Sequence, residues 1–467
     1  MQSRVRVCAL VLVAALLPAA IAVAQLTPLE QLGKNLYFDS NLSNPNQMSC
    51  ASCHLPTAGF ADPDLALPTS LGVIDSRYGN RNSPSSAYAA FTPPFQYDAA
   101  AMVYFGGQFW DGRAATLEDQ AKGPFLNPLE MANPNQTSVV TDVIRSSYGD
   151  LFRQLIGKNN SAIMADVAGT YDFIAGAIAT YERSAELNRF NSKYDGYMAG
   201  KVELTAAELR GLALFEGRAN CSLCHTARPA ADGTPPLLTE WEYHNLGVPR
   251  NPANLFYTVP LTFNPDGAAY IDYGLGGRLG EADQMGKFKT MTLRNIGVTA
   301  PYMHNGAFQT LTQVVDFMNS RDLGGWPAPE VPLNVSTVIG NLGLGATDVQ
   351  DVVAFLNTLT DGYAPPALQL AGSAIPAGLT LEQNLPNPFN PATQIRFSLT
   401  EPAFVRLEVF NLQGRRVATL FEGDCAAGSR VVRWDAADGD QPVASGLYFY
   451  RLQAGKAALT RSMLLLK

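Results

Sequence analysis

The sequence predicts a mostly α-helical protein that ends in a small antiparallel β-sandwich. Two observations predict the helical part: a helix-start signature occurs twice, and a Cys-x-x-Cys-His motif follows each copy. A third observation predicts the sandwich, because short stretches of alternating apolar and polar residues recur after residue 379. At 467 residues the chain exceeds one ordinary core, so several domains are expected.

The composition is that of a globular protein, with 47% hydrophobic and 16% charged residues. The formal net charge of −8 argues against a nucleic-acid-binding protein, which would show a basic surface. An acidic surface instead suits transient docking of a basic partner.

Residues 1–24 have the pattern of a secretory signal peptide. Arg4 and Arg6 precede an apolar run, and Ala22-Val23-Ala24 forms a small-x-small cleavage site. A membrane anchor is the alternative, but the run is short and ends at the cleavage site. We therefore expect an exported chain that begins at Gln25.

Four of the six cysteines lie in two Cys-x-x-Cys-His motifs. The motifs consist of Cys50, Cys53 and His54, and of Cys221, Cys224 and His225. Two thiols at this spacing can add to the vinyl groups of one haem while the adjacent imidazole reaches the iron. A four-cysteine zinc site and a pair of redox-active dithiols are the alternatives, but neither explains both histidines and the export signal. The motifs predict two covalently bound haem c groups, with His54 and His225 as iron ligands.

The two motifs belong to an internal duplication. Capping boxes begin at Thr27 and Thr205, and each is followed by a glycine, Gly33 or Gly211. A helical stretch closes each half, with apolar faces formed by Ile163, Val167, Tyr171, Ile174, Ile178 and Tyr181, and by Val349, Val352, Val353 and Leu356. We expect two cytochrome c-like domains, at residues 25–200 and 201–362.

The two halves differ in the residues that could lie opposite the proximal histidine. A haem used only for electron transfer takes two protein ligands, and Met318 could supply a thioether opposite His225, although a packing role is the alternative. The first half has no such ligand and instead carries Gln120 and Glu130. A carboxylate there can move a proton between the two oxygens of peroxide. The alternative is that both are solvated loop residues.

Several longer motifs resemble those of bacterial di-haem cytochrome c peroxidases and their relative MauG, over roughly residues 26–362. They are Phe109–Arg113, Thr116–Ala121, Asn127–Met131, Leu293–Asn295 and Thr299–Gly306. The resemblance implies that the first domain reduces hydrogen peroxide and that the second supplies electrons. The electrons would come from a small donor protein, either a c-type cytochrome or a copper protein, and a homodimer is one assembly that the resemblance suggests.

The resemblance also implies residue roles. Glu130 would be the catalytic acid and base, Gln120 its companion, and Trp110 the residue between the haems. Met318 would ligate the high-potential haem at the position where MauG has a tyrosine. Calcium between the haems would be held by Asn82 and by the carbonyl oxygens of Thr299 and Pro301, because oxygen ligands suit this cation.

One departure from the family pattern concerns gating. Many of these peroxidases have a histidine that caps the peroxidatic iron, but residues 55–82 contain none. The first haem is therefore expected to be open in the resting state. Two other functions stay open: MauG-like oxidation of a protein substrate, and a non-enzymatic electron conduit. His244 and His304 are interpreted as structural or supporting residues.

A linker is expected at residues 363–378, followed by an Ig-like β-sandwich at 379–467. The segments Leu381–Pro391 and Ala444–Tyr450 resemble the C-terminal sorting domains of the type IX secretion machinery. This resemblance implies passage through the periplasm and then export to the cell surface or medium. A sandwich that binds carbohydrate or a protein partner is the alternative.

Overall fold

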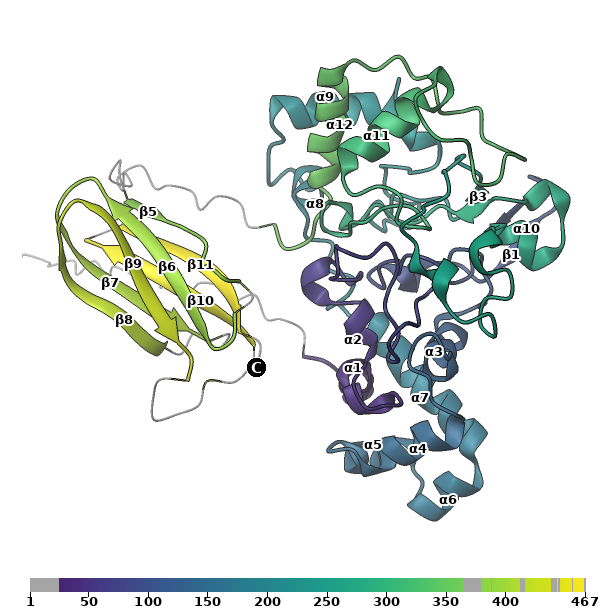
Figure 1. The fold of residues 1–467 in the computed structure, drawn as a ribbon, viewed down its shortest axis with the longest axis horizontal. Helices are drawn as coiled ribbons and strands as arrows, with labels where there is room; N and C mark the ends of the chain where they lie inside the picture. The colour runs from purple at the N-terminus through teal and green to yellow at the C-terminus, as the bar shows by residue number, and fades with distance from the viewer. Residues whose placement is uncertain are drawn as a thin grey trace, which may run out of the picture. The chain divides into compact units, whose positions relative to one another are not determined.

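The computed structural model describes residues 25–363, 379–387, 389–411, 416–437, 443, 446–455 and 457–465. The predicted signal peptide and residues 364–378 of the predicted linker lie outside these ranges. The chain divides into two compact units, residues 1–363 and 364–467 (Figure 1). In the parts of the chain that the structure describes, no helix has both the length and the apolar character needed to cross a membrane.

The first unit is mainly helical and consists of two similar halves. Its helices up to residue 200 are α1 (Pro28–Phe38), α2 (Cys50–Cys53), α3 (Leu117–Leu126), α4 (Gln136–Arg145), α5 (Gly149–Ile156), α6 (Asn160–Ala165), α7 (Val167–Glu182) and α8 (Lys193–Met198). The remaining helices are α9 (Ala206–Glu216), α10 (Gly274–Leu279), α11 (Leu311–Ser320) and α12 (Ala346–Asn357). Two small antiparallel pairs join β1 (Gln96–Asp98) to β2 (Val103–Phe105) and β3 (Tyr243–His244) to β4 (Phe288–Lys289).

The same helix crossing occurs in both halves. The predicted capping boxes at Thr27 and Thr205 are formed and begin α1 and α9. A Cβ atom added at Gly33 would lie 1.9 Å from the carbonyl oxygen of Ala177 on α7, and one added at Gly211 would lie 1.9 Å from that of Asp351 on α12. Glycine is therefore needed at both crossings, because the two backbones approach too closely for any side chain.

The duplication extends to the segments that carry the remaining motifs. An isolated bridge pairs Gln108 with Ala114 before α3, and an equivalent bridge pairs Tyr302 with Phe308 before α11. Both helices then begin directly after a threonine whose side chain caps them, Thr116 or Thr310. The two helices can therefore be matched residue by residue from their first positions.

The closing helix of the first half differs from the prediction. The expected continuous apolar face from Ile163 to Tyr181 is divided between α6 and α7. Asp166 lies at the junction, where its side chain accepts a hydrogen bond from the amide of Gly169 and begins a new helix. The capping preference of this aspartate therefore overrides the continuous apolar period.

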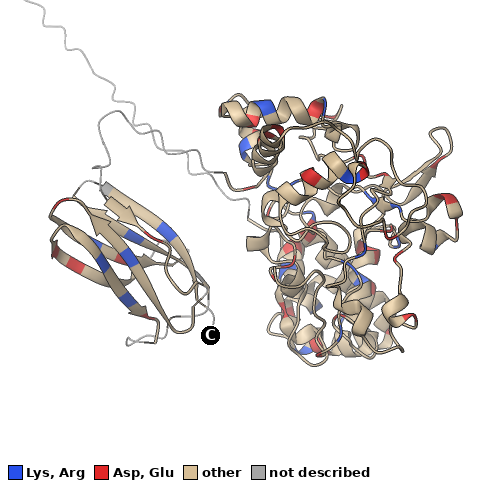
Figure 2. Ribbon diagram, turned by 45° about the horizontal axis from the view of Figure 1, so that its top comes forward, with Lys and Arg blue, Asp and Glu red and all other residues tan. Residues whose placement is uncertain are grey.

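Each half has its own apolar core. One cluster contains buried residues of α1, α3, α4 and α7, and another contains buried residues of α9, α11 and α12. Acidic and basic residues are interspersed along the ribbon of the first unit (Figure 2). They do not form the single basic stripe that a nucleic-acid-binding surface would require.

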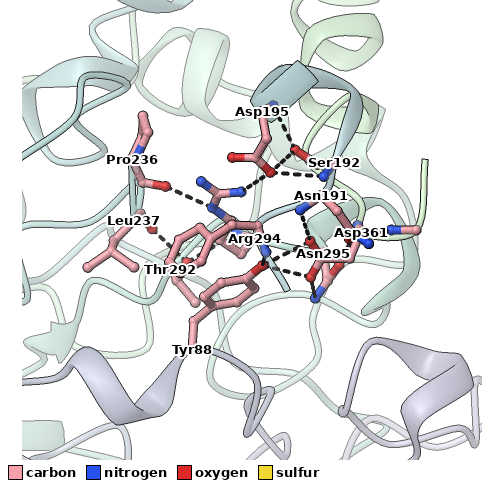
Figure 3. Close-up of polar contacts among 12 residues, drawn as sticks. Tyr88, Asn191, Ser192, Asp195, Pro236, Leu237, Thr292, Arg294, Asn295 and Asp361 are labelled. Carbon is pink, nitrogen blue, oxygen red and sulfur yellow. Dashed lines mark hydrogen bonds and ion pairs between the residues drawn. The ribbon is translucent and has the colours of Figure 1, made fainter. Parts of the chain in front are cut away.

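A buried arginine joins the two halves at the motif around Asn295 (Figure 3). Arg294 is 1% exposed and donates to the carboxylate of Asp195 at 2.6 Å and to the carbonyl oxygen of Pro236 at 2.7 Å. Its guanidinium lies 5.3 Å from the ring centre of Tyr88 in the first half. The Tyr88 hydroxyl in turn donates to the carboxylate of Asp361 at 2.8 Å. A buried charge of this kind fixes the arrangement of the segments around it.

The second unit consists of two antiparallel sheets. One has the order β11-β10-β7-β8 and the other the order β5-β6-β9. The strands are β5 (Leu379–Leu381), β6 (Ala392–Leu399), β7 (Ala403–Phe410), β8 (Arg416–Cys425), β9 (Gly428–Asp435), β10 (Gly446–Ala454) and β11 (Ala457–Leu465). Buried side chains from both sheets form one apolar cluster, so the predicted C-terminal β region is present. Cys425 is buried and forms no disulfide with any other cysteine that the structure describes.

We predict that Gly33→Ala destabilises the protein by about 1–3 kcal/mol, because the added methyl group meets backbone atoms that cannot move aside. Gly176→Ala on α7 is the matched control. Nothing lies within 4 Å of a Cβ atom at Gly176, so this change should be neutral or slightly stabilising. Urea unfolding of the two variants measures the difference, and equal stabilities would contradict the proposed crossing.

Candidate active site

Each Cys-x-x-Cys-His motif lines its own cavity in the helical unit. Cys50, Cys53 and His54 line the first cavity, between α1, α3 and α7. Cys221, Cys224 and His225 line the second, between α9, α11 and α12. The two cysteine pairs therefore do not come together as one four-cysteine zinc site.

The two histidines are held in the same way. The Nδ1 atom of His54 lies 3.2 Å from the carbonyl oxygen of Phe60, and that of His225 lies 2.8 Å from the carbonyl oxygen of Leu238. Burial lowers the pKa of both imidazoles, so each is neutral near pH 7. A neutral imidazole that donates from Nδ1 offers its Nε2 to a metal.

Three of the four cysteine thiols of the motifs are deeply buried. Burial raises the pKa of Cys50, Cys53 and Cys221 to about 12. Thiols at such sites are protonated and are poor ligands for a metal that requires thiolate. The arrangement suits covalent attachment of a group that fills the cavity better than it suits a redox-active dithiol.

Glu130 lines the first cavity, as the sequence predicts. It follows α3 in a turn, where the side-chain amide of Asn127 donates to its Oε1 at 2.9 Å. Burial raises the pKa of the Glu130 carboxyl above its ordinary value, although Arg113 and Asn127 act in the opposite direction. A carboxyl group with a raised pKa can exchange a proton more readily near neutral pH.

Helices α3 and α11 give the two cavities different walls. Counting from the first residue of each helix, Gln120 occupies the place of Val314, and Pro124 occupies the place of Met318. Gln120 and Pro124 line the first cavity, whereas Val314 and Met318 line the second. Proline has no side-chain atom that can ligate a metal, so the first cavity offers an amide and a carboxyl where the second offers a thioether.

Trp110 lines both cavities and also the space between them. Its indole nitrogen donates to the carbonyl oxygen of Asn82 at 2.8 Å. Its ring lies edge-on to His304, with the ring centres 6.4 Å apart. One aromatic side chain therefore forms part of the wall of both cavities.

His304 and His244 have supporting positions. The ring of His304 stacks on Phe288 at 3.6 Å between ring centres, and His304 lies at the place in the duplication that Trp110 occupies in the first half. His244 Nε2 lies 3.0 Å from a carboxylate oxygen of Glu240, and this pair lies close to the Cys224 sulfur.

The residues predicted to hold calcium lie together between the cavities. Asn82, Thr299 and Pro301 line one common space. The side-chain nitrogen of Asn82 donates to the carbonyl oxygen of Pro301 at 2.5 Å and to that of Met303 at 3.3 Å. The carbonyl groups are therefore directed at the Asn82 amide, which would have to present its oxygen instead to ligate a cation.

Sequence reasoning missed several residues of the first cavity. Arg113, Tyr37 and Glu182 line it together with the predicted residues. The Tyr37 hydroxyl hydrogen-bonds to Ser86 at 2.7 Å and donates to the backbone carbonyl oxygen of His54 at 3.1 Å. The sequence repeat already matches Tyr37 with Phe215 after the paired glycines, but this match did not indicate that Tyr37 lines the cavity.

Comparisons with known proteins agree with this geometry. A model of the di-haem cytochrome c peroxidase family matches residues 27–203. The methylamine utilization protein MauG of Paracoccus denitrificans is 37% identical over 79% of this chain and 99% of its own. Cytochrome c551 peroxidase of Pseudomonas aeruginosa is 31% identical over 71% of this chain and 78% of its own. The crystal structure of the dihaem peroxidase BthA of Burkholderia thailandensis covers 73% of this chain and 90% of its own, at 32% identity and a TM-score of 0.63.

Both cavities fit a c-type haem. Each offers two thiols, an imidazole with a free Nε2 and largely apolar walls.

We predict that a Cys50→Ala, Cys53→Ala double variant carries one covalent haem instead of two, as measured by intact-protein mass spectrometry. Cys425→Ala is the control and should retain both, because Cys425 lies in the β unit. Retention of two haems by the double variant would contradict the assignment.

Proposed function

This chain belongs to the di-haem cytochrome c peroxidase family, a family of haem oxidoreductases with two c-type haems, and on that premise we propose that it reduces hydrogen peroxide to water. The observation that carries the proposal is the difference between the two cavities. Gln120, Pro124 and Glu130 line the cavity of the first motif. Met318 lines the cavity of the second.

His54 and His225 would hold the two haem irons, with one pair of cysteines attached to each haem. Haem would supply the one-electron redox chemistry of the reaction. Met318 would help to hold the second haem together with His225, which would suit that site to electron transfer. The absence of a ligating side chain at Pro124 would leave room for peroxide in the first cavity.

Glu130 would move the proton that cleavage of the peroxide bond requires. Its carboxylate takes the proton from one oxygen of hydrogen peroxide and returns it to the other, so that the second oxygen leaves as water. Gln120, which lies on α3 and lines the same cavity, can donate a hydrogen bond from its side-chain amide to the bound peroxide or to water. Trp110 would assist electron transfer between the cavities, because it lines both.

MauG-like oxidation of a protein substrate is the second candidate. The 37% identity to MauG over most of both chains favours it. The resemblance places a tyrosine in MauG where this chain has Met318, and a thioether ligand supports the peroxidase assignment instead. A non-enzymatic electron conduit has less support, because it would not require Glu130 and Gln120 at the first cavity.

Several further assignments rest on the sequence. We propose calcium between the haems at Asn82, Thr299 and Pro301, and electron donation by a small c-type cytochrome or copper protein. We also propose a cleaved signal peptide, a periplasmic stage, and export to the cell surface or medium by the type IX secretion machinery through residues 379–467. The expected domains at 25–200 and 201–362, the linker at 363–378 and the homodimer also stay proposals.

We predict that Glu130→Gln lowers peroxide turnover by about 10²- to 10⁴-fold, the usual contribution of a positioned acid and base. Glu118→Gln is the control, because Glu118 is paired with Arg183 on the outer side of α3.

The pH profile of peroxide turnover supplies a second test of Glu130. Because burial raises the pKa of Glu130, wild-type turnover should fall as the pH drops through that raised value, and this limb should be absent in the glutamine variant. Full turnover by Glu130→Gln would refute the assignment.

We predict that the haem-loaded protein reacts with hydrogen peroxide from the fully oxidised state, because residues 55–82 contain no histidine that could cap the first iron. Stopped-flow absorbance compares the fully oxidised and the one-electron-reduced protein. Similar rates support an open site, whereas reaction from the half-reduced protein alone would show that another group caps the iron. Lack of reaction from both states would favour the electron conduit.

A further inference from the structure

Glu182 is a buried carboxyl group for which the proposed function has no role. It is the last residue of α7, it is 5% exposed, and its side chain lines the first cavity. Its Oε2 atom has no hydrogen-bond partner, and no ion pair involves the residue within the described chain. Buried polar groups are almost always hydrogen-bonded, so a buried carboxyl oxygen without a partner beside a cofactor cavity requires an explanation.

The second half shows that the fold does not need a carboxyl group at this position. A Cβ atom at Gly33 would contact Tyr181, and one at Gly211 would contact Phe355, so these two aromatic residues are equivalent. The next residue on each helix is Glu182 in α7 and Leu356 in α12, and each lines the cavity of its own half. Leucine fills this place in the second half, so the glutamate in the first half is a specific difference between two otherwise matched walls.

We propose that Glu182 is a proton-binding residue that takes up a proton when the first haem is reduced and releases it when that haem is oxidised. In the reductive step one electron arrives from the second half, one proton arrives from solvent, and an O–H bond forms on the carboxylate. This role for Glu182 deepens the proposed peroxidase function, and its part in catalysis rests on that function. Reduction of one hydrogen peroxide to two waters consumes two electrons and two protons, so a residue that binds a proton can serve the reaction.

The electrostatic reason is the charge added to the cavity on reduction. An added electron makes the cavity more negative, and within a poorly solvated wall this raises the affinity of a nearby carboxylate for a proton. Burial is the main reason that the pKa of Glu182 is raised to about 8, so the group can change its protonation state near neutral pH.

The surrounding charges do not neutralise Glu182. Arg183 lowers its pKa and Glu118 raises it, but these two residues form an ion pair with each other at 2.6 Å. The other titratable side chains that line the cavity are Tyr37 of α1, Cys50 and Cys53 of the attachment motif, His54, Arg81, Arg113 and Glu130. The cysteines and the histidine are occupied once haem is attached, so Glu182 and Glu130 are the two protein carboxyl groups that line the cavity. Glu130 accepts a hydrogen bond from Asn127 and is influenced by Arg113, both of which favour its charged form, whereas Glu182 Oε2 has no such partner.

Spectroelectrochemical titration of the haem-loaded protein across a pH series tests the proposal. In the wild type, one of the two haem potentials should fall with rising pH by up to about 59 mV per unit, since one proton then accompanies one electron. Glu182→Gln should abolish this slope. Its potential should equal that of the wild type at low pH, where Glu182 is neutral, and exceed it at high pH, where Glu182 is charged.

Two further variants and an infrared measurement make the result specific. Glu130→Gln should keep the slope, and Leu356→Glu should introduce a slope in the other haem potential. The infrared difference spectrum between reduced and oxidised protein should show a protonated carboxyl group gained on reduction, and Glu182→Gln should lack this signal. A slope that survives in Glu182→Gln, or that disappears in Glu130→Gln instead, would overturn the proposal.

This experiment separates the two proposals. A pH-dependent potential that requires Glu182, in a protein without peroxide turnover, would refute the peroxidase function and support the role of Glu182. Peroxide turnover by wild-type protein whose potentials do not change with pH would do the reverse.

Discussion

The arrangement of the first unit depends on two arginines that join its halves, Arg294, which is buried, and Arg81, which is mostly shielded. Arg81, beside Asn82, donates to Asp272 of the second half at 2.6 Å and pairs with Asp111 at 2.8 Å. Arg294 makes the second link, through Asp195 and the Tyr88 ring. Removing one partner from a buried ion pair typically costs about 3–5 kcal/mol, because the remaining charge stays buried and unpaired. These links hold the two cavities at a fixed separation, with Trp110 between them.

The two halves share one scaffold and differ in a few wall positions. The matched glycines bring α1 against α7 and α9 against α12, and the matched threonines begin α3 and α11. On this common frame proline replaces methionine, glutamine replaces valine, and glutamate replaces leucine in the first half. The fold alone therefore explains two similar cofactor sites, and their different chemistry comes from individual side chains.

Similarity to relatives does not by itself select the reaction. The chain is 37% identical to MauG and 31% identical to cytochrome c551 peroxidase, and both alignments span most of the helical unit. A change in one axial ligand is enough to shift the potential of a haem, so few positions need to differ between two such activities. Met318 lines the same cavity as His225 and is the residue that we propose for this role.

The sequence by itself determined the attachment motifs, the internal duplication, the two capping-box helix starts and the C-terminal strands, because each depends on patterns along the chain. Capping boxes at Thr27 and Thr205 and the spacing of Cys50, Cys53 and His54 are local signals. The sequence pattern did not predict the helix break at Asp166, where two local preferences compete.

Only the tertiary structure decided which side chains share a cavity. Glu182 lies far from Cys50 in the sequence, although both line the first cavity. Pro124 is recognised as the counterpart of Met318 only when α3 and α11 are aligned from their first residues. The physical reason is that burial and charge at a site are set by contacts between distant segments, which no local pattern records.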